Sequence, residues 1–262
     1  MSRLRRFFRA VKEFFSPSKP GPVPAPEPVV TPCLVDELCD DHDTDYSNPD
    51  KPEVCDWVPE IYRAEYLHLW ETMKYPVLRS GVNAGRRREQ TAGSLQWSIN
   101  FVQRGIHRYK RAAQMIKDEL GSNVPWQLIG CLHLREAGGY TGDPFSRNLM
   151  NGQPINRVTT WVPRGFGPWD SFEASCVDAF RIKSLPPCWS IENTLYFVER
   201  YNGMGYRVES RRRTVGFSPY LFAYSNHYLG GYFVADHQFD SRAVALGVGV
   251  AVLLKELGFD GE

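Results

Sequence analysis

The stretch "CLHLREAGGY" (residues 131–140) closes an almost wholly apolar segment with a charged pair and two glycines. The apolar side chains that follow Pro125 leave little polar face, so we predict a helix that is buried on most sides. Proline near the start and Gly138-Gly139 past the end are typical of a short helix. The sequence therefore predicts a buried helix that stops at these glycines.

Glu136 lies at the last turn of this predicted helix. The negative end of the helix dipole and partial desolvation both disfavour a charged carboxylate, so its pKa is expected to be raised. A raised carboxyl pKa is what a general acid needs near neutral pH. On this stretch alone, an ordinary exposed glutamate beside Arg135 is the favoured explanation of the residue.

Composition bounds the rest of the chain. A chain of 262 residues with 42% hydrophobic and 13% aromatic content can form one well-packed domain with appendages. The formal net charge of +1 gives no overall field that would favour nucleic acid. No apolar run is long enough to span a bilayer, and the N-terminus lacks the apolar core of a secretory signal.

Residues 1–56 are expected to form an irregular N-terminal arm, followed by a domain over residues 57–262. The basic tip, residues 1–19, places apolar and basic side chains on opposite sides of a helix. This pattern fits contact with an anionic membrane surface, docking on a partner, or a disordered basic tail. Residues 16–32 form a proline-rich linker, and an acidic segment follows to about residue 56.

Two metal motifs in the arm are incomplete. One combines His42 with three cysteines in a spacing that matches no standard zinc finger: Cys33, Cys39 and Cys55. The other resembles a calcium loop over residues 41–52, but Tyr46 replaces its glycine and Pro52 its chelating glutamate. We therefore expect no metal and no organic cofactor.

From Trp57 onward the apolar spacing is mainly helical. Helices are predicted within residues 59–75, 94–120, 125–137, 170–183, 190–203 and 240–257. Residues 138–170 are rich in Gly, Pro and Asn, and "NRVTTWVP" (156–163) is the one convincing strand. Asp170 is expected to cap the helix that follows, with Glu173 completing a capping box. The predicted class is mainly α (α+β), with a small β insert.

An ordered set of motifs then resembles the lysozyme-like superfamily of goose-type lysozymes and soluble lytic transglycosylases, and most closely phage-type and bacterial lysozyme-like proteins. The blocks read "EAG" (136–138), "NLMNGQPI" (148–155), "TTWVPRGFGPW" (159–169), "SCVDAF" (175–180), "YNGMGYR" (201–207), "SPYLFAYSNHY" (218–228) and "GGYFVADHQFD" (230–240). The resemblance covers roughly residues 100–256. It implies a lysozyme-like fold and cleavage of peptidoglycan.

The resemblance implies that Glu136 is the catalytic acid. It also implies sugar contacts from a set of polar residues in the later blocks: Asn151, Thr159, Tyr201, Asn202, Tyr206 and Tyr224. Without the resemblance, Asn151-Gly152 would be a tight turn and Asn202 part of a helix stop. One departure is that Ala137 stands where the family usually has a serine beside the acid.

The second catalytic group stays open. Cleavage of a glycosidic bond needs a protonated carboxyl at the leaving oxygen and stabilisation of an oxocarbenium-like centre. Four carboxylates are candidates for the second role: Asp143, Asp170, Glu173 and Asp178. Relatives often use one essential glutamate, so we nominate no nucleophile. Attack by water would give hydrolysis, whereas attack by the muramyl 6-hydroxyl would give an anhydro product.

Three rival classes compete with this interpretation. A cysteine-histidine amidase would pair a thiol with an imidazole, drawing on Cys131, Cys176, His227 and His237. A zinc peptidase would use His133 and Glu136, but the second histidine of H-E-x-x-H is absent. The third is a non-catalytic wall-binding or virion structural module of the same fold.

Partners and location follow from the enzyme interpretation. The expected partner is a peptidoglycan glycan strand, with an anionic membrane surface as a further partner of residues 1–19. We expect a monomer that binds no nucleic acid. It would be made as a soluble protein, stay in the producing cell or a virion, and act in the periplasm or cell wall.

Overall fold

The computed structural model describes residues 57–261 except 79, 84, 85, 90, 91, 236 and 237. The interpretations of the N-terminal arm therefore lie outside the described residues, as does His237. The residues described here belong to one compact unit, Cys55–Glu262.

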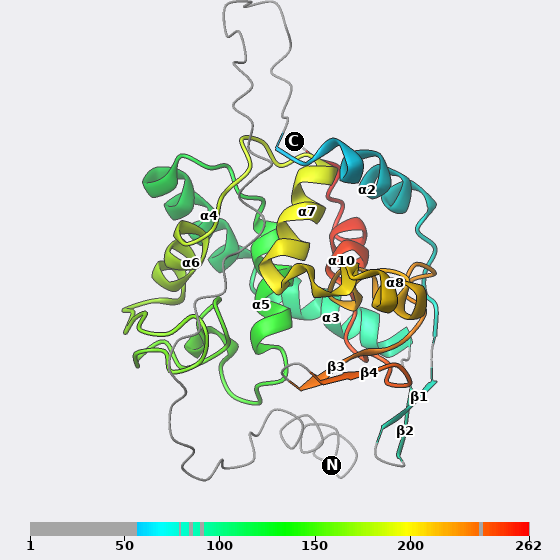
Figure 1. Cartoon of the computed structure of the whole chain (residues 1–262). Helices are drawn as coiled ribbons and strands as arrows, with labels where there is room; N and C mark the ends of the chain where they lie inside the picture. Colours follow the sequence, from blue (N-terminus) through cyan, green and yellow to red (C-terminus); the bar gives the residue numbers. More distant parts are fainter. Residues whose placement is uncertain (1–56, 79, 84–85, 90–91, 236–237, 262) are drawn as a thin grey trace, which may run out of the picture. The chain divides into compact units, whose positions relative to one another are not determined.

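The described chain is mainly helical, which confirms the predicted class (Figure 1). The α-helices are α2 (Glu60–Thr72), α3 (Ala92–Arg104), α4 (Ile106–Leu120), α5 (Trp126–Ala137), α6 (Phe172–Arg181), α7 (Ile191–Asn202), α8 (Glu209–Val215), α9 (Pro219–Phe222) and α10 (Val250–Glu256). Two short 3-10 helices are η1 (Pro144–Ser146) and η2 (Met204–Arg207). Two antiparallel hairpins pair β1 (Ser80–Asn83) with β2 (Arg86–Glu89), and β3 (Tyr232–Ala235) with β4 (Gln238–Asp240).

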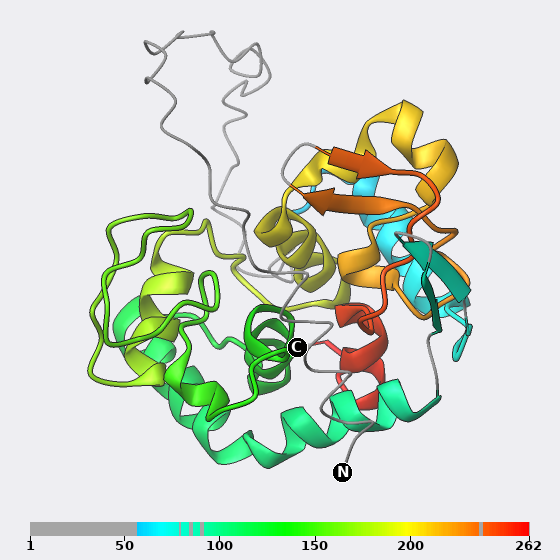
Figure 2. The same cartoon turned by 90° about the horizontal axis from the view of Figure 1, so that it is seen from below.

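Helix α5 is the centre around which the other helices pack. It contacts α3, α4 and α10, and Figure 2 shows it with α10 beside it and α3 and α4 running below. Every residue from Leu128 to Leu134 is buried, as the apolar pattern predicts. A Cβ at Gly130 would lie 2.6 Å from a methyl carbon of Val102, so glycine permits the close approach of α3. The helix ends at Ala137, before the two glycines.

The helix predicted across residues 94–120 is interrupted. Gly105 separates α3 from α4, and its backbone is not helical (φ −92°, ψ 0°). A Cβ at this position would lie 2.5 Å from the ring of Tyr109, so a larger residue would clash. The interruption lets α4 turn toward α6, with which it makes extensive contacts.

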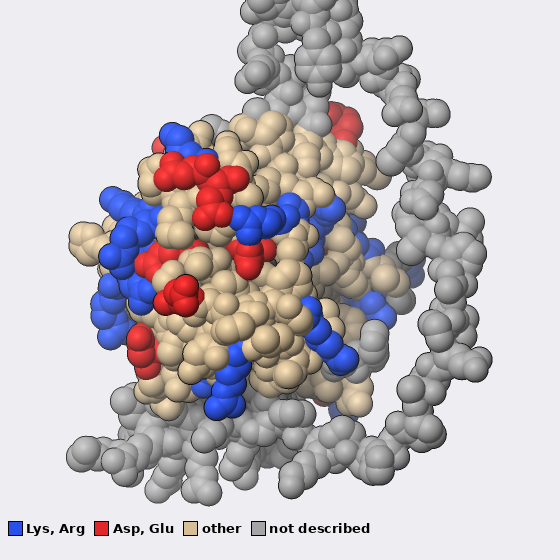
Figure 3. Space-filling view, turned by 90° about the vertical axis from the view of Figure 1, so that its left-hand side faces the viewer, with Lys and Arg blue, Asp and Glu red and all other residues tan. Residues whose placement is uncertain are grey.

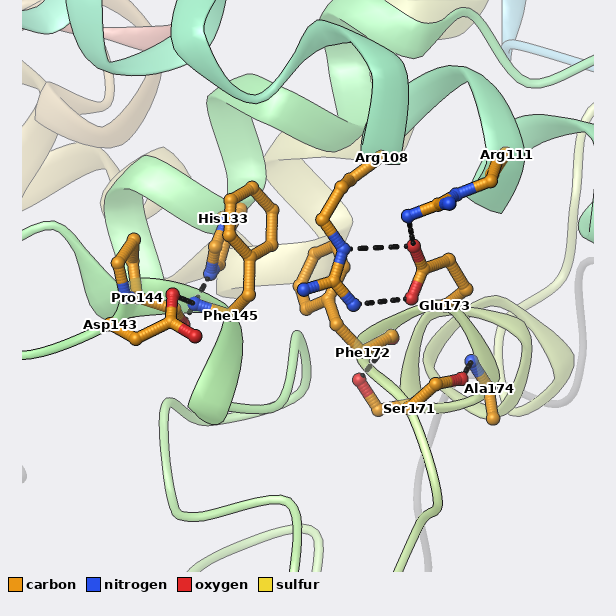
Figure 4. Close-up of polar contacts among 11 residues, drawn as sticks. Arg108, Arg111, His133, Asp143, Pro144, Phe145, Ser171, Phe172, Glu173 and Ala174 are labelled. Carbon is orange, nitrogen blue, oxygen red and sulfur yellow. Dashed lines mark hydrogen bonds and ion pairs between the residues drawn. The ribbon is translucent and has the colours of Figure 1, made fainter.

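The predicted cap of α6 is wrong by one residue. Ser171, not Asp170, caps the helix, and its Oγ accepts a hydrogen bond from the Ala174 amide at 3.1 Å. Glu173 takes no part in a capping box. Instead it accepts two hydrogen bonds from Arg108 of α4, at 2.9 and 2.6 Å (Figure 4). Arg111 adds a third contact at 3.1 Å, so the carboxylate joins α6 to α4.

The predicted strand at residues 156–163 is also wrong. These residues form an irregular loop, because the amides of Thr160 and Trp161 donate to the side-chain Oε1 of Gln153, each at 2.9 Å, rather than to a strand. Gln153 also donates from Nε2 to the Thr160 hydroxyl at 2.9 Å. The β structure of the described residues lies instead in the two hairpins.

The last predicted helix begins later than expected. Helix α10 starts at Val250, whereas the pattern predicts helix from residue 240. The preceding segment is held in an extended course: the Ala245 amide donates to the Tyr228 hydroxyl at 2.9 Å, and the Gly249 amide to the Ala223 carbonyl at 2.9 Å. Tertiary hydrogen bonds therefore replace the helical ones before Val250.

Charges of both signs are interspersed on the face shown in Figure 3. On the surface of α4 and α6, Arg181 forms ion pairs with Glu119 at 2.5 Å and with Asp178. Among the described residues, no helix has the length and apolar character needed to cross a membrane.

We predict that Glu173→Ala lowers the free energy of unfolding by about 3 kcal/mol, because it leaves Arg108 without its buried partner. Glu119→Ala removes a similar pair whose side chains are both about half exposed, so it should cost less than about 1 kcal/mol. Urea denaturation of both variants at pH 7 measures the difference. Equal losses would contradict a stabilising role for the Glu173 contact.

Candidate active site

Glu136 is the acid that the structure places at the end of the buried helix. It belongs to the last turn of α5, where the main-chain carbonyls give the helix end a negative potential. Its neighbours Leu134 and Ala137 are buried, whereas Glu136 keeps part of its surface exposed to solvent. The residue is thus partly exposed, while its carboxyl is enclosed by protein.

Burial raises the pKa of Glu136 from 4.5 to about 7. A hydrogen bond from Tyr220 and the positive charges of Arg135 and Lys183 oppose this rise without cancelling it. No carboxylate of the described chain is among the causes of the shift. The expectation of a raised pKa therefore agrees with the geometry, and desolvation is its main cause.

Tyr220 is the residue that contacts the carboxyl directly. Its hydroxyl donates to Glu136 Oε1 at 3.0 Å from the short helix α9. The phenol is buried, and the adjacent Glu136 charge helps to raise its pKa well above the usual value. Tyr220 therefore remains a neutral donor that fixes one carboxyl oxygen.

Tyr201 of α7 lies within electrostatic range of Glu136. Burial, and then the charge of Glu136, raises the pKa of Tyr201 well above its usual value, which indicates that the two groups are close. Its hydroxyl donates to the Leu149 carbonyl at 2.7 Å. This bond ties α7 to the turn at Asn151-Gly152. A Cβ at Gly152 (φ +68°) would lie 2.3 Å from the Glu136 carbonyl oxygen, so the turn packs directly against the backbone of the acid.

Two residues predicted to contact sugar, Asn151 and Thr159, instead form hydrogen bonds within the loop that contains them. The Asn151 amide nitrogen donates to the carbonyls of Trp161 and Pro163 at 3.2 and 3.4 Å, and its oxygen accepts from the Gln153 amide at 3.2 Å. Thr159 is buried, and its hydroxyl donates to the Pro163 carbonyl at 2.8 Å. The side chains of both residues therefore hold the loop in place.

The other predicted contacts have different surroundings. Asn202 is exposed at the end of α7, so its amide is accessible. Tyr206 is buried and accepts a hydrogen bond from the Phe233 amide at 3.2 Å. Burial raises the pKa of Tyr206, and the positive charge of Arg135 opposes this rise. Tyr224 is fully buried in the core, and Tyr220 takes the place beside the acid.

The four candidates for a second carboxylate have other roles or lie elsewhere. Asp143 is exposed and caps η1 through the Phe145 amide at 3.0 Å. Asp178 accepts from the Trp169 indole at 2.8 Å and pairs with Arg181, while Glu173 pairs with Arg108. Asp170 is exposed beside the cap of α6.

The structure gives the cysteine-histidine rival little support. Cys131 and Cys176 are fully buried free thiols, and burial raises the pKa of both, which disfavours a reactive thiolate. His227 faces the Leu69 carbonyl at 2.9 Å rather than a thiol. Cys188 is disulfide-bonded and offers no thiol.

His133 is a core residue rather than a metal ligand. Its Nε2 faces the Pro144 carbonyl at 3.0 Å, and since a carbonyl only accepts, Nε2 carries the proton (Figure 4). Nδ1 then accepts from the Tyr109 hydroxyl at 2.9 Å. Burial lowers the pKa of His133 to about 4, so the ring is neutral. The described residues contain no group of three His, Cys, Asp or Glu side chains suited to a metal ion.

The chain matches no protein-family model, no curated protein and no solved structure. The interpretation of the site therefore depends on its own geometry and on the motif resemblance.

Sequence reasoning missed Tyr220 and Lys183. Tyr220 lies in "SPYLFAYSNHY", the same block as Tyr224, and the motif does not distinguish which of the two tyrosines lies beside the acid. Lys183 follows the end of α6, where no periodic pattern indicates its direction. Its ammonium lies 4.9 Å from the centre of the Tyr201 ring, and its charge lowers the pKa of Glu136.

We predict that Glu136→Gln stabilises the protein at pH 8 relative to wild type, but not at pH 4.5. The folded carboxyl holds its proton up to about pH 7, whereas the unfolded one releases it near 4.5, so wild-type stability falls as pH rises between these values. Allowing for partial exposure, we expect a difference of about 1–2 kcal/mol.

Urea denaturation at both pH values measures this difference. The variant Glu71→Gln changes an exposed glutamate of α2 and serves as the control. An equal effect of Glu136→Gln at the two pH values would contradict a buried carboxyl that titrates near neutrality.

Proposed function

We propose that the protein cleaves the glycan strand of peptidoglycan, with Glu136 as the general acid. The observation that carries the proposal is the carboxyl of a partly exposed residue, which has a pKa of about 7 and accepts a hydrogen bond from a tyrosine hydroxyl. The motif resemblance supports the choice of the bond between N-acetylmuramic acid and N-acetylglucosamine.

The chemistry begins with proton transfer. Protonated Glu136 donates its proton to the glycosidic oxygen as the bond from that oxygen to the anomeric carbon breaks. The donor Tyr220 stabilises the carboxylate that remains. Because Asp143 caps η1 and two other candidate carboxylates, Asp178 and Glu173, pair with arginines, the proposed mechanism uses one acid.

The nucleophile decides the product. A water molecule that attacks the anomeric carbon returns a proton to Glu136 and gives a reducing end. The 6-hydroxyl of the same muramyl ring can attack instead, and then gives a 1,6-anhydro end with the same return of the proton. Both reactions are compatible with one acid.

Peptidoglycan digestion tests the acid and the reaction together. We expect wild type to release muropeptides with reducing or anhydro ends, identified by mass, and Glu136→Gln to lower the rate by about 10²–10⁴-fold. Asp143→Asn is the matched control: it keeps an oxygen to cap η1 and should retain activity.

Each remaining outcome has a clear meaning. Loss of activity in Asp143→Asn would contradict the one-acid mechanism. Absence of cleavage by wild type on acetylated and deacetylated glycan would overturn the enzyme proposal. Glycan binding without cleavage would then identify the alternative, a non-catalytic cell-wall-binding or virion structural module.

The pH profile provides a separate prediction. The Tyr220 hydrogen bond lowers the pKa of Glu136, so Tyr220→Phe should raise that pKa. Since the acid must be protonated, activity falls as pH rises through the pKa. We therefore expect the alkaline limb of kcat/KM to lie near pH 7 in wild type and at higher pH in Tyr220→Phe. Turnover measured from pH 5 to 9 checks this, and an unmoved limb would contradict the role of Tyr220.

A further inference from the structure

In the part of the chain that the structure describes, two cations near Glu136 form no ion pair with a carboxylate. The Lys183 ammonium lies 4.9 Å from the centre of the Tyr201 ring, and the Arg135 guanidinium carbon lies 4.7 Å from that of Tyr220. These are the two tyrosines that flank the acid.

Their hydrogen-bonding groups are not satisfied by the described protein. The Nε atom of Arg135 is buried and has no hydrogen-bond partner there. The same guanidinium is confined on another side, because a Cβ at Gly247 would lie 2.4 Å from its Nη1 atom. Lys183 is half-buried and forms no ion pair within the described chain. A ring face attracts a cation but accepts few of its N–H groups.

Two other partly buried arginines of the described chain are paired with carboxylates. Arg108 meets Glu173 at 2.6 Å, and Arg207 meets Glu65 and Glu199 at 2.7 and 2.8 Å. Arg147 resembles Arg135, since its Nε is also buried without a partner in the described chain and its guanidinium stacks on Tyr140 at 3.8 Å. What distinguishes Lys183 and Arg135 is their place, because both charges act on Glu136.

We propose that Lys183 and Arg135 bind a carboxylate of the substrate next to Glu136. This inference rests on the proposed function, because it names the chemical group that the glycan must present there. With Glu136 protonated, the surroundings of the acid carry two positive charges, which favour an anionic ligand. Arg135 offers a planar fork for a carboxylate, and Lys183 a compact charge.

Peptidoglycan can supply such a carboxylate from two sources. A glycan without peptides carries it on the lactyl group of each muramyl ring. In a peptide-bearing glycan the lactyl group is an amide, so the carboxylates belong to the peptide. The two ligands therefore distinguish the sources, and amidation of the peptide-free glycan removes its charge while retaining its rings.

The experiment measures binding of muramyl tetrasaccharides to full-length Glu136→Gln by calorimetry, so that cleavage does not interfere. We expect at least one carboxylate-bearing ligand to bind about tenfold more tightly than the amidated peptide-free glycan, the usual scale for a charge-assisted hydrogen bond. Adding Lys183→Met or Arg135→Met should remove most of this preference and leave affinity for the amidated glycan unchanged.

Lys110→Met is the matched control, since Lys110 is an exposed lysine of α4 that lies 6.0 Å from the Trp126 ring. It should leave the preference intact. Equal affinity for charged and amidated ligands, or a preference that survives both substitutions, would overturn the inference but not the proposed function. Failure to bind any of the glycans would overturn both.

Lys183→Met keeps the test valid if Arg135→Met fails to fold, because Lys183 lies outside α5 and follows the end of α6. If Lys183 and Arg135 served only to adjust the pKa of Glu136, substituting them would not change binding to Glu136→Gln, because that variant has an amide in place of the carboxyl. That result would also overturn the inference.

Discussion

Desolvation of the last turn of α5 is the constraint on which the site depends. The helix is buried from Leu128 to Leu134. Glu136 in its last turn therefore lies near α7, α9 and the turn at Gly152. A charged carboxylate is costly there, and its pKa rises to about 7. The same apolar packing that stabilises the fold therefore sets the protonation of the proposed acid.

The neighbours of Glu136 modulate this constraint without removing it. Tyr220 donates one hydrogen bond, and two cations lie nearby without forming an ion pair with the carboxyl. A direct ion pair would have lowered the pKa much further and left no proton to donate. In contrast, the buried Glu173 meets Arg108 directly and its pKa is lowered. The pKa values of Glu173 and Glu136 thus differ in direction because Glu173 is paired with a cation, whereas the cations near Glu136 are stacked on rings.

Local patterns in the sequence predicted much of the helical framework. Apolar spacing predicted α5 and α7, and the glycine that follows each helix predicted where it ends. These predictions succeed because such signals act within one or two helical turns. The strand expected at residues 156–163 does not form, because the side chain of Gln153 accepts hydrogen bonds from the amides of Thr160 and Trp161, which a strand would need. Tyr220 could not be distinguished from Tyr224, since α9 has only four residues and Tyr224 lies at φ +78°, where helical spacing no longer applies.

The contact between Gly152 and the Glu136 carbonyl positions the backbone of Glu136 without the serine that the motif resemblance would lead one to expect at Ala137. A serine beside the acid could orient it through a hydrogen bond, whose strength changes when the carboxyl gains or loses a proton. Here the backbone of the acid is positioned by steric contact with a turn, and that turn is held by the amide of Asn151. Steric contact does not depend on charge. In the proposed mechanism, the main chain that carries the carboxyl can therefore keep one position while the proton leaves and returns.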